Sequence, residues 1–279
     1  MVLLAGGAGW IYRLSLRPAR TPVSKPLFRG VHYDRRVYDA PRPIVVHIVT
    51  LKLNTPGLQL TVTSGNAEQD RPFSAQSTSE FLSRTGTQIA VNGSFFEPFY
   101  IHSPWDYYPR RGDPVDALGL VVTNGEAMAA DAPALAALCI GSEGARIVAP
   151  PYGDDVHTSL PGDPVLVRNG VIGERVTMWN HDLGPRTAVG VSVDGNTVWL
   201  VAVDGRQPRY SEGMTLAELA AVFVDLHADA ALNLDGGGST TLVMESERGP
   251  KLLNAPIHGR VPMRERPVAT HLGVYADAL

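Results

Sequence analysis

Several short stretches of the chain alternate hydrophobic and polar residues, the pattern typical of strands with one buried face. Residues 43–53 are rich in Val and Ile, and residues 58–63 repeat the pattern after the turn signal Asn54-Thr55-Pro56-Gly57. This pair predicts a hairpin. Asn-Gly or Asp-Gly turns predict three more hairpins, at residues 118–128, 165–172 and 187–203.

Two stretches carry the spacing of a helical capping box, in which a hydroxyl residue is followed three positions later by Glu. Ser77 and Glu80 open a short helix that runs through Arg84 and ends at Gly86. Thr215 and Glu218 open a longer one, in which apolar residues recur at helical spacing as far as Leu226. Both segments are therefore expected to be helices.

The remaining strands follow from apolar runs between turn signals. The predicted segments are residues 87–91, a strand near Leu138, a buried strand at 230–234 with a glycine turn and a partner at 240–244, and a closing strand at 268–275. Residues 99–114 are aromatic and proline-rich without periodicity, which predicts a long loop. The fold class expected is α+β, with one domain built on a large, mostly antiparallel or mixed β-sheet flanked by a few helices.

The N-terminus differs from the rest of the chain. Residues 1–11 are apolar, Arg13, Arg17 and Arg20 follow, and the stretch is shorter than the roughly 20 residues that span a bilayer. We interpret residues 1–30 as the remnant of a signal or anchor with a lead-in that becomes ordered toward Val31, and residues 31–279 as the domain. A disordered arm is the alternative. The expected location is secreted, periplasmic or exposed at the cell envelope, with weak membrane association through the N-terminus.

Charge and cysteine content exclude some classes of protein. The chain has 24 basic and 28 acidic residues and a net charge of −4, which disfavours nucleic acid as a partner. Cys139, the only cysteine, excludes an intrachain disulfide and a cysteine-rich metal site. Its apolar neighbours indicate a buried thiol. The eight histidines show no paired metal-ligand spacing.

The segment Asn233-Leu234-Asp235-Gly236-Gly237-Gly238-Ser239-Thr240-Thr241 carries the strongest chemical signal. A buried strand ends there in a carboxylate, three glycines and three hydroxyl residues, so backbone amides can approach a ligand closely. A glycine-rich hairpin with Asp235 capping its own turn is the plainer alternative. The contiguous glycines, the lack of a following Lys and the strand that comes next all differ from a phosphate-binding P-loop.

Other polar residues lie at strand ends. Arg186 begins one strand of a predicted hairpin and Asp204 follows the other, so the two side chains are expected to lie close together, in a site or as an ion pair at its rim. Asn92 follows the strand at 87–91, and Glu265 and Arg266 precede the closing strand.

These segments, in this order, resemble the phosphodiester glycosidase family. The resemblance rests on Asn-Gly-Ser-Phe-Phe, Arg-Thr-Ala-Val-Gly, Asp-Gly-Arg, Gly-Met-Thr-Leu-x-Glu-Leu-Ala, Asn-Leu-Asp-Gly-Gly-Gly-Ser-Thr-Thr and Glu-Arg-Pro-Val-Ala, and covers roughly residues 87–275. The family includes the lysosomal enzyme that uncovers mannose 6-phosphate by removing N-acetylglucosamine. Ser94 stands where the family usually has glycine, and the aromatic segment is longer than in the lysosomal enzyme.

The resemblance implies a hydrolase that acts on a sugar-1-phosphodiester or related glycan. Arginine forks suit a phosphate and carboxylates suit acid or base catalysis. The catalytic candidates are Asp204, Asp235, Arg186 and, in reserve, Glu265. The candidates for substrate binding are Asn92, Arg206, Gly236, Gly237, Gly238, Ser239, Thr240 and Arg266. The acid, the base and the bond that breaks, C–O or P–O, stay open. The sequence specifies no cofactor, and a divalent cation held by Asp204, Asp235 and phosphate oxygens stays open.

A different class of function competes with this one. The chain can be a non-catalytic glycan-binding module, or a module of exopolysaccharide or envelope biogenesis, in which Trp105, Tyr107 and Tyr108 stack on sugars. Convergence of Arg186, Asp204 and Asp235 in one cleft would favour the enzyme.

Overall fold

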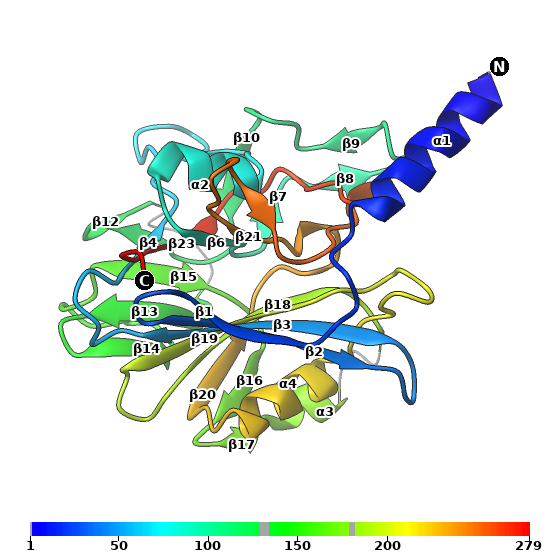
Figure 1. The fold of residues 1–279 in the computed structure, drawn as a ribbon. Helices are drawn as coiled ribbons and strands as arrows, with labels where there is room; N and C mark the ends of the chain where they lie inside the picture. Colours follow the sequence, from blue (N-terminus) through cyan, green and yellow to red (C-terminus); the bar gives the residue numbers. More distant parts are fainter. Residues whose placement is uncertain (1, 129–133, 179–181) are drawn as a thin grey trace.

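The computed structural model describes residues 2–128, 134–178 and 182–279, and its core is an eight-stranded antiparallel sheet. Figure 1 shows this sheet as the central layer of the molecule. Its strand order is β1 (Val23–Phe28), β2 (Val31–Tyr38), β3 (Ile44–Lys52), β19 (Thr197–Val203), β18 (Arg186–Val191), β20 (Ala230–Asn233), β16 (Val165–Arg168) and β17 (Val171–Ile172).

Smaller antiparallel sheets lie over one face of this layer (Figure 1). The first has the order β22 (Lys251–Leu252), β21 (Leu242–Met244), β6 (Ile89–Asn92), β23 (His271–Tyr275) and β4 (Gln59–Val62). The second has the order β12 (Glu126–Ala127), β11 (Val122–Thr123), β15 (Thr158–Pro161), β13 (Ala137–Gly141) and β14 (Gly144–Val148). Short strands complete the set: β5 (Phe73–Ser74), β10 (Pro114–Ala117), β7 (Phe96–Glu97), β8 (Tyr100–Ile101) and β9 (Tyr107–Tyr108).

The helices are α1 (Val2–Ser15), α2 (Thr78–Thr85), α3 (Glu174–Met178) and α4 (Leu216–Asp225), with short 3₁₀ turns η1 (Gly237–Ser239) and η2 (His258–Arg260). Three of the helices, α2, α3 and α4, lie on the outer faces of the sheets, whereas α1 extends away from them (Figure 1). The capping boxes predicted for α2 and α4 are both present, with hydrogen bonds in each direction. Gly86 ends α2 in the left-handed conformation, at φ 71°, which glycine adopts without steric cost.

Both faces of the central sheet are buried, which explains why its strands read as continuous apolar runs. Along β3, Val49 and Leu51 face the smaller sheets, whereas Ile48 faces the helical side, because successive side chains of a strand point in opposite directions. On the helical side α4 packs so closely that a Cβ at Gly190 would lie 2.5 Å from Phe223. Only glycine at position 190 permits that contact.

The expected α+β class is confirmed, with mainly antiparallel strands and few helices. The hairpins β11–β12, β16–β17 and β18–β19 are confirmed, as is the strand at Leu138. The expected long loop at residues 99–114 contains the short hairpin β8–β9. The strands form several layered sheets and not the one large sheet expected.

Two expected hairpins are wrong. β3 lies in the central sheet, whereas β4 pairs with β23 in a different sheet. Likewise β20 pairs with β18, whereas β21 pairs with β6. In both cases the strand that follows the turn residues pairs in a neighbouring sheet. Turn chemistry specifies a local reversal and not the distant partner of the next strand.

Regular structure also begins earlier than Val31. β1 pairs with β2 at the edge of the central sheet from Val23 onward. Helix α1 precedes it and extends away from the body of the protein (Figure 1), and Met1 lies outside the described residues. Within the described part of the chain, no helix has the length and apolar character needed to cross a membrane.

The end of α1 and its connection to β1 contact the domain through few side chains. Arg13 donates to the Pro262 carbonyl at 3.4 Å, the guanidinium of Arg17 lies 4.5 Å from the centre of the Tyr210 ring, and the Tyr210 hydroxyl donates to the Pro18 carbonyl at 3.0 Å. Residues 16–20 therefore contribute more contact with the domain than the described part of α1.

Two truncations test this division. Deleting residues 1–15 is expected to change the melting temperature by less than about 2 °C, whereas deleting residues 1–20 exposes the Tyr210 ring and lowers it by about 2–6 °C, as about 1–2 kcal/mol does in a domain of this size. Thermal unfolding followed by circular dichroism measures both. Aggregation of the protein that lacks residues 1–15, or an equal loss of melting temperature in both proteins, would show instead that α1 packs on the domain.

Candidate active site

A cavity of about 560 Å³ opens where three strands of the central sheet end. Arg186 begins β18, and the chain reaches Arg206 just beyond β19 and Asp235 just beyond β20. Since β18 is antiparallel to both neighbours, its start lies beside their ends. The lining residues are Phe95, Phe99, Ile101, Asp163, Pro164, Arg186, Arg206, Leu216, Asn233, Leu234, Asp235, Gly236, Gly237, Gly238 and Arg266.

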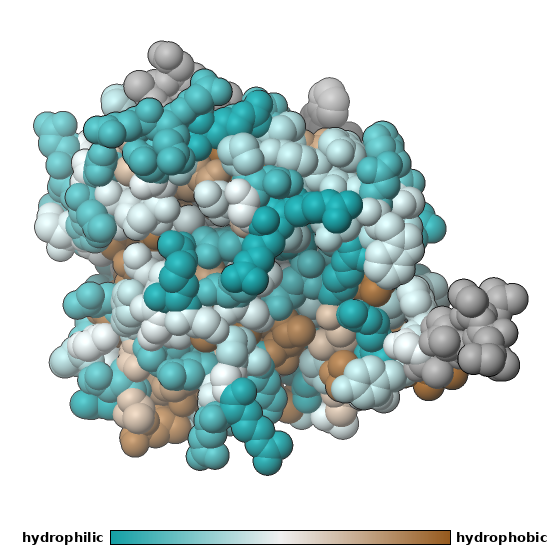
Figure 2. Space-filling view, turned by 90° about the horizontal axis from the view of Figure 1, so that it is seen from above, coloured by the Kyte–Doolittle hydropathy of each residue, from teal (hydrophilic) through white to brown (hydrophobic). Residues whose placement is uncertain are grey.

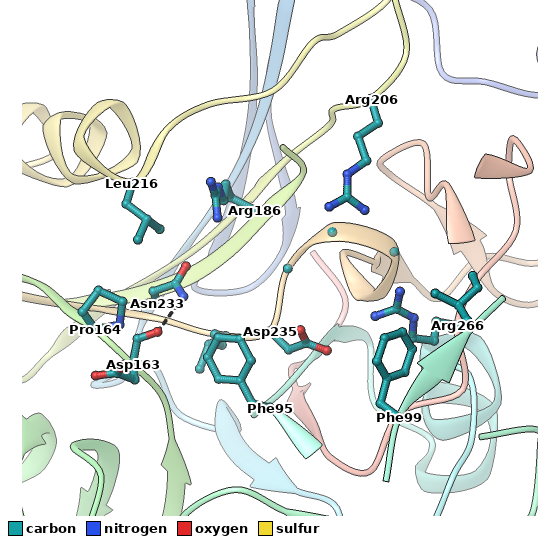
Figure 3. A pocket seen from close by; sticks show the side chains of 15 residues that line it. Phe95, Phe99, Asp163, Pro164, Arg186, Arg206, Leu216, Asn233, Asp235 and Arg266 are labelled. Atoms are coloured by element: carbon teal, nitrogen blue, oxygen red, sulfur yellow. Dashed lines mark hydrogen bonds between the residues drawn. The ribbon is translucent and has the colours of Figure 1, made fainter. Parts of the chain in front are cut away.

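The glycine segment, Gly236-Gly237-Gly238, lets two arginines lie directly against the backbone (Figure 3). A Cβ at Gly238 would lie 2.5 Å from a guanidinium nitrogen of Arg266, and one at Gly237 would lie 3.1 Å from Arg206. Gly237 also has φ 62°, a value that side-chain-bearing residues rarely adopt. Any larger residue at position 238 would displace the Arg266 guanidinium from the cavity wall.

Arg266 is held in place on several sides. Its Nη1 donates to Ser239 Oγ at 3.0 Å and its Nε donates to His258 Nδ1 at 3.2 Å, while its guanidinium lies 4.3 Å from the centre of the Phe99 ring. Burial, with the neighbouring arginines, lowers the pKa of His258 to about 3, so the ring is neutral and can accept this bond. Burial also lowers the pKa of Arg266 itself, opposed by Asp235. The guanidinium is therefore fixed before any ligand arrives.

Arg186 and Arg206 complete a cationic wall. Arg186 donates through Nε to the Met214 carbonyl at 2.9 Å, and its pKa is lowered first by burial and then by the charge of Arg206. Arg206 is exposed, and no hydrogen-bond or ion-pair partner for its guanidinium occurs among the described residues. Three arginines against the carboxylates Asp163 and Asp235 give the cavity an excess of positive charge, which favours an anionic ligand.

Asp235 is the carboxylate next to the arginines. It is half-buried, its Oδ2 accepts a short hydrogen bond from Ser239 Oγ, and Ser239 in turn accepts from Arg266. Burial raises the pKa of Asp235, opposed by the charge of Arg266 and by the Ser239 hydrogen bond. The carboxyl group therefore holds its proton to a higher pH than an exposed Asp, as is common for groups that transfer protons.

Asn233 and Asp163 form the opposite wall, and neither was predicted from the sequence as a site residue. Asn233 Nδ2 donates to the Asp163 carbonyl at 2.8 Å, the bond drawn in Figure 3, and the buried Oδ1 of Asn233 has no hydrogen-bond partner among the described residues. A buried acceptor is costly when it is unsatisfied. Because Asn233 lines the cavity, a ligand hydroxyl can supply the missing donor. The sequence signal for Asn233 was its position directly before Leu234, Asp235 and the glycines.

Asp204, a predicted catalytic residue, does not line the cavity. Its carboxylate is fully buried and accepts hydrogen bonds from His47 Nε2 at 2.9 Å, Asn254 Nδ2 at 3.2 Å and the Ala255 amide at 2.7 Å. The expected ion pair with Arg186 is therefore replaced by these partners. Val203 is the residue that pairs with Arg186, and beyond it the side chain of Asp204 turns into the interior between the sheets.

Four other predicted residues lie behind the cavity wall. Glu265 accepts from the Ser79 amide at 2.9 Å and hydroxyl at 2.6 Å in the first turn of α2. Asn92 Oδ1 accepts from Thr187 and from the Thr241 amide. The remaining two, Ser239 and Thr240, are buried beneath the glycine segment. In addition to Asp235, six predicted residues do line the cavity: Arg186, Arg206, Gly236, Gly237, Gly238 and Arg266.

Cation binding by Asp204 together with Asp235 is not supported by this geometry. Both oxygens of Asp204 are occupied by protein donors, and Asp204 does not line the cavity that holds Asp235. Within residues 2–128, 134–178 and 182–279, no group of three His, Cys, Asp or Glu side chains is placed to share a metal ion.

The aromatic segment packs beside the cavity instead of forming a free loop. Tyr107 lies 4.6 Å from the His258 ring and 4.7 Å from the Arg264 guanidinium, and the Tyr108 hydroxyl donates to the Pro114 carbonyl. Trp105 is 76 % exposed. From above, the surface is mainly hydrophilic, with apolar side chains in small separate groups (Figure 2).

The fold and the site together define the class of protein. It is an α+β protein with layered antiparallel sheets, and its cleft brings three arginines together with a carboxylate. The chain belongs to the phosphodiester glycosidase family, whose model matches residues 85–275. A comparison with curated protein sequences gave no match.

Solved structures share the fold. The zebrafish N-acetylglucosamine-1-phosphodiester alpha-N-acetylglucosaminidase catalytic domain, auto-inhibited by its pro-peptide, is 19 % identical, with a TM-score of 0.61 over 95 % of this chain and 92 % of that one. A Synechocystis protein is 15 % identical, with a TM-score of 0.58 over 92 % and 64 %. A Burkholderia pseudomallei protein described as exported is 17 % identical, with a TM-score of 0.58 over 86 % and 75 %.

The position of Asp204 leads to a stability prediction. Asp204→Asn replaces one acceptor oxygen by a donor that faces other donors, so we expect the free energy of unfolding to fall by about 2–4 kcal/mol, the cost of unsatisfied buried polar groups. Chemical denaturation measures this. Asp154→Asn, at an exposed position, is the control. Equal stability of the two variants would contradict a structural role for the Asp204 network.

Proposed function

We propose that this protein hydrolyses sugar-1-phosphodiesters and breaks the bond between the anomeric carbon and the phosphate oxygen. The observation that carries the proposal is the convergence of Arg186, Arg206 and Arg266 with Asp235 around the glycine segment (Figure 3). A phosphodiester carries one negative charge, shared by two non-bridging oxygens that a guanidinium group binds through paired hydrogen bonds. The contacts of Arg266 with Ser239, His258 and Phe99 support such binding, because they orient the guanidinium group before a ligand binds.

Asp235 acts as the general base in this proposal. It takes a proton from a water molecule, the water oxygen bonds to the anomeric carbon, and the C–O electron pair leaves with the phosphate as a phosphomonoester. The arginines stabilise the extra negative charge that develops on that phosphate. A phosphomonoester is a good leaving group, so the charge on the arginines replaces much of the need for a separate acid.

Asn233 and Asp163 are proposed to bind the sugar. The Oδ1 of Asn233, which has no partner within the described parts of the chain, and the carboxylate of Asp163 both offer acceptors for sugar hydroxyls on the side of the cavity away from Arg266. The name of the zebrafish structure specifies N-acetylglucosamine, so N-acetylglucosamine is the sugar we propose to test first.

A screen of purified protein tests the reaction. N-acetylglucosamine 1-phosphodiesters should release N-acetylglucosamine and a phosphomonoester, whereas aryl phosphodiesters without a sugar should not react. In heavy-oxygen water the label should enter the sugar, and entry into the phosphate would instead indicate P–O cleavage. Parallel assays with a chelator report whether a divalent cation takes part.

Glycan binding without turnover is the second candidate. It is favoured by Trp105, which is 76 % exposed and whose ring centre lies 5.6 Å from the Arg264 guanidinium. An exposed indole can stack on a sugar ring. Retention of a glycan by the wild type without release of any product would support this candidate over hydrolysis.

We also propose that the protein acts outside the cytoplasm. The apolar helix α1, the arginines that follow it and the description of the Burkholderia pseudomallei protein as exported support this location. Fractionation of cells that express the full chain tests it.

Replacing Asp235 separates catalysis from folding. Asp235→Asn keeps the size of the side chain and removes its basicity, so turnover should fall by about 100-fold to 10,000-fold, with a melting temperature near that of the wild type. Steady-state kinetics on an accepted phosphodiester provides the measurement, with Asp154→Asn as the control. Near-normal turnover would reject the catalytic role.

The pH dependence tests the same group. A base must be deprotonated, so kcat/KM rises with pH through the pKa of Asp235. The Ser239 hydroxyl lowers that pKa because it binds the charged carboxylate. In Ser239→Ala this bond is lost, the pKa rises, and the acidic limb of the profile should move to higher pH by about 1 unit.

The control for the pH experiment is Ser159→Ala, which removes a buried hydroxyl that does not line the cavity. Its acidic limb should coincide with that of the wild type. A limb that stays in place or moves to lower pH in Ser239→Ala would show that the profile does not report Asp235.

A further inference from the structure

A second cavity, of about 310 Å³, lies beside the first. Ile101, Arg206 and Arg266 line both cavities. The two are therefore neighbouring chambers of one cleft, and the two guanidinium groups stand between them.

The chambers differ in chemistry. The first contains Asp163 and Asp235, whereas none of the residues that line the second is acidic. The second adds Arg260 and His102 to the two shared arginines. No hydrogen-bond or ion-pair partner for the exposed Arg260 guanidinium occurs in the described part of the chain.

The wall of the second chamber has an unusual backbone. Arg206 has φ 56° and Arg260 has φ 61°, values that are uncommon for residues with side chains and are often retained at functional sites. Between His258 and Arg260, Gly259 also has a positive φ, and a Cβ there would lie 3.3 Å from Pro104. The glycine therefore lets the turn that carries Arg260 pack closely on the aromatic segment.

We propose that the second chamber binds the alcohol portion of the phosphodiester and selects an alcohol that carries its own anionic group, a carboxylate or a further phosphate. The proposal rests on the proposed function. A phosphodiester joins two groups at one phosphorus, so a phosphate held between Arg206 and Arg266 directs the sugar into one chamber and the alcohol into the other. Arg260 is the residue that contacts the additional anion and determines specificity.

The test measures binding first, because binding does not depend on turnover. Three probes are titrated calorimetrically: benzyl phosphate, 4-carboxybenzyl phosphate and 4-phosphonobenzyl phosphate. The wild type should bind the two anionic probes about tenfold more tightly than benzyl phosphate, as one charge-assisted hydrogen bond allows. A stronger preference for either anionic probe distinguishes carboxylate from phosphate as the natural group.

Arg260→Asn should abolish this preference and leave the affinity for benzyl phosphate unchanged. Asn is chosen because it tolerates a positive φ. Arg209→Asn is the matched control, because Arg209 is also an exposed arginine at positive φ, 67°, but lines neither chamber. It should keep the wild-type preference.

Equal binding of the three probes by the wild type, or a preference that survives in Arg260→Asn, overturns the inference. Turnover of N-acetylglucosamine 1-phosphate esterified with benzyl or 4-carboxybenzyl alcohol separates it from the proposed function. Hydrolysis of both esters without an anionic preference would leave the function standing and the subsite wrong. A preference in binding without hydrolysis of either ester would leave the subsite standing and the function wrong.

Discussion

The arrangement of the cavity depends on the hydrogen bonds that the buried carboxylate of Asp204 accepts. Through His47 it is tied to β3 of the central sheet, and through Asn254 and Ala255 to the chain that follows β22 in the neighbouring sheet. Asn254 also bonds to the Thr240 carbonyl and the Leu242 amide, directly after the glycine segment. One charge therefore fixes the spacing between two sheets beneath the cleft, and a charge without these donors would be too costly to bury.

The cleft itself depends on that fixed spacing. Asp235 lies at the end of a strand of the central sheet, whereas Arg266 precedes β23 of the neighbouring sheet. Their separation is therefore set by how the layers pack, and Ser239 completes the contact between them. Such pre-positioned charge needs little reorganisation when a ligand binds or reacts, which is the property that makes electrostatic stabilisation effective.

Local features of the fold could be read from the sequence, and long-range ones could not. The capping boxes at Ser77 and Thr215 depend only on residues three positions apart, and both helices start there. The sheet to which β4 or β21 belongs depends on partners far along the chain, which no turn signal encodes. The same limit applies to the cleft. Motifs correctly selected Arg186, Asp235 and Arg266, but they also selected Asp204. Asp204 is an aspartate at a strand end, like Asp235, and only the packing shows that it is buried.

The edge of the central sheet has a consequence for the behaviour of the protein in solution. β1 is the outermost strand at one of the two edges, and an unpaired strand edge can recruit another chain into a continuous sheet. Pro26 lies within β1 and lacks an amide hydrogen, and the pairing with β2 shifts register just after it. Proline and a bulge both interrupt a straight row of donors. This edge is therefore poorly suited to intermolecular strand pairing, which favours resistance to aggregation even where the sheet is open to solvent.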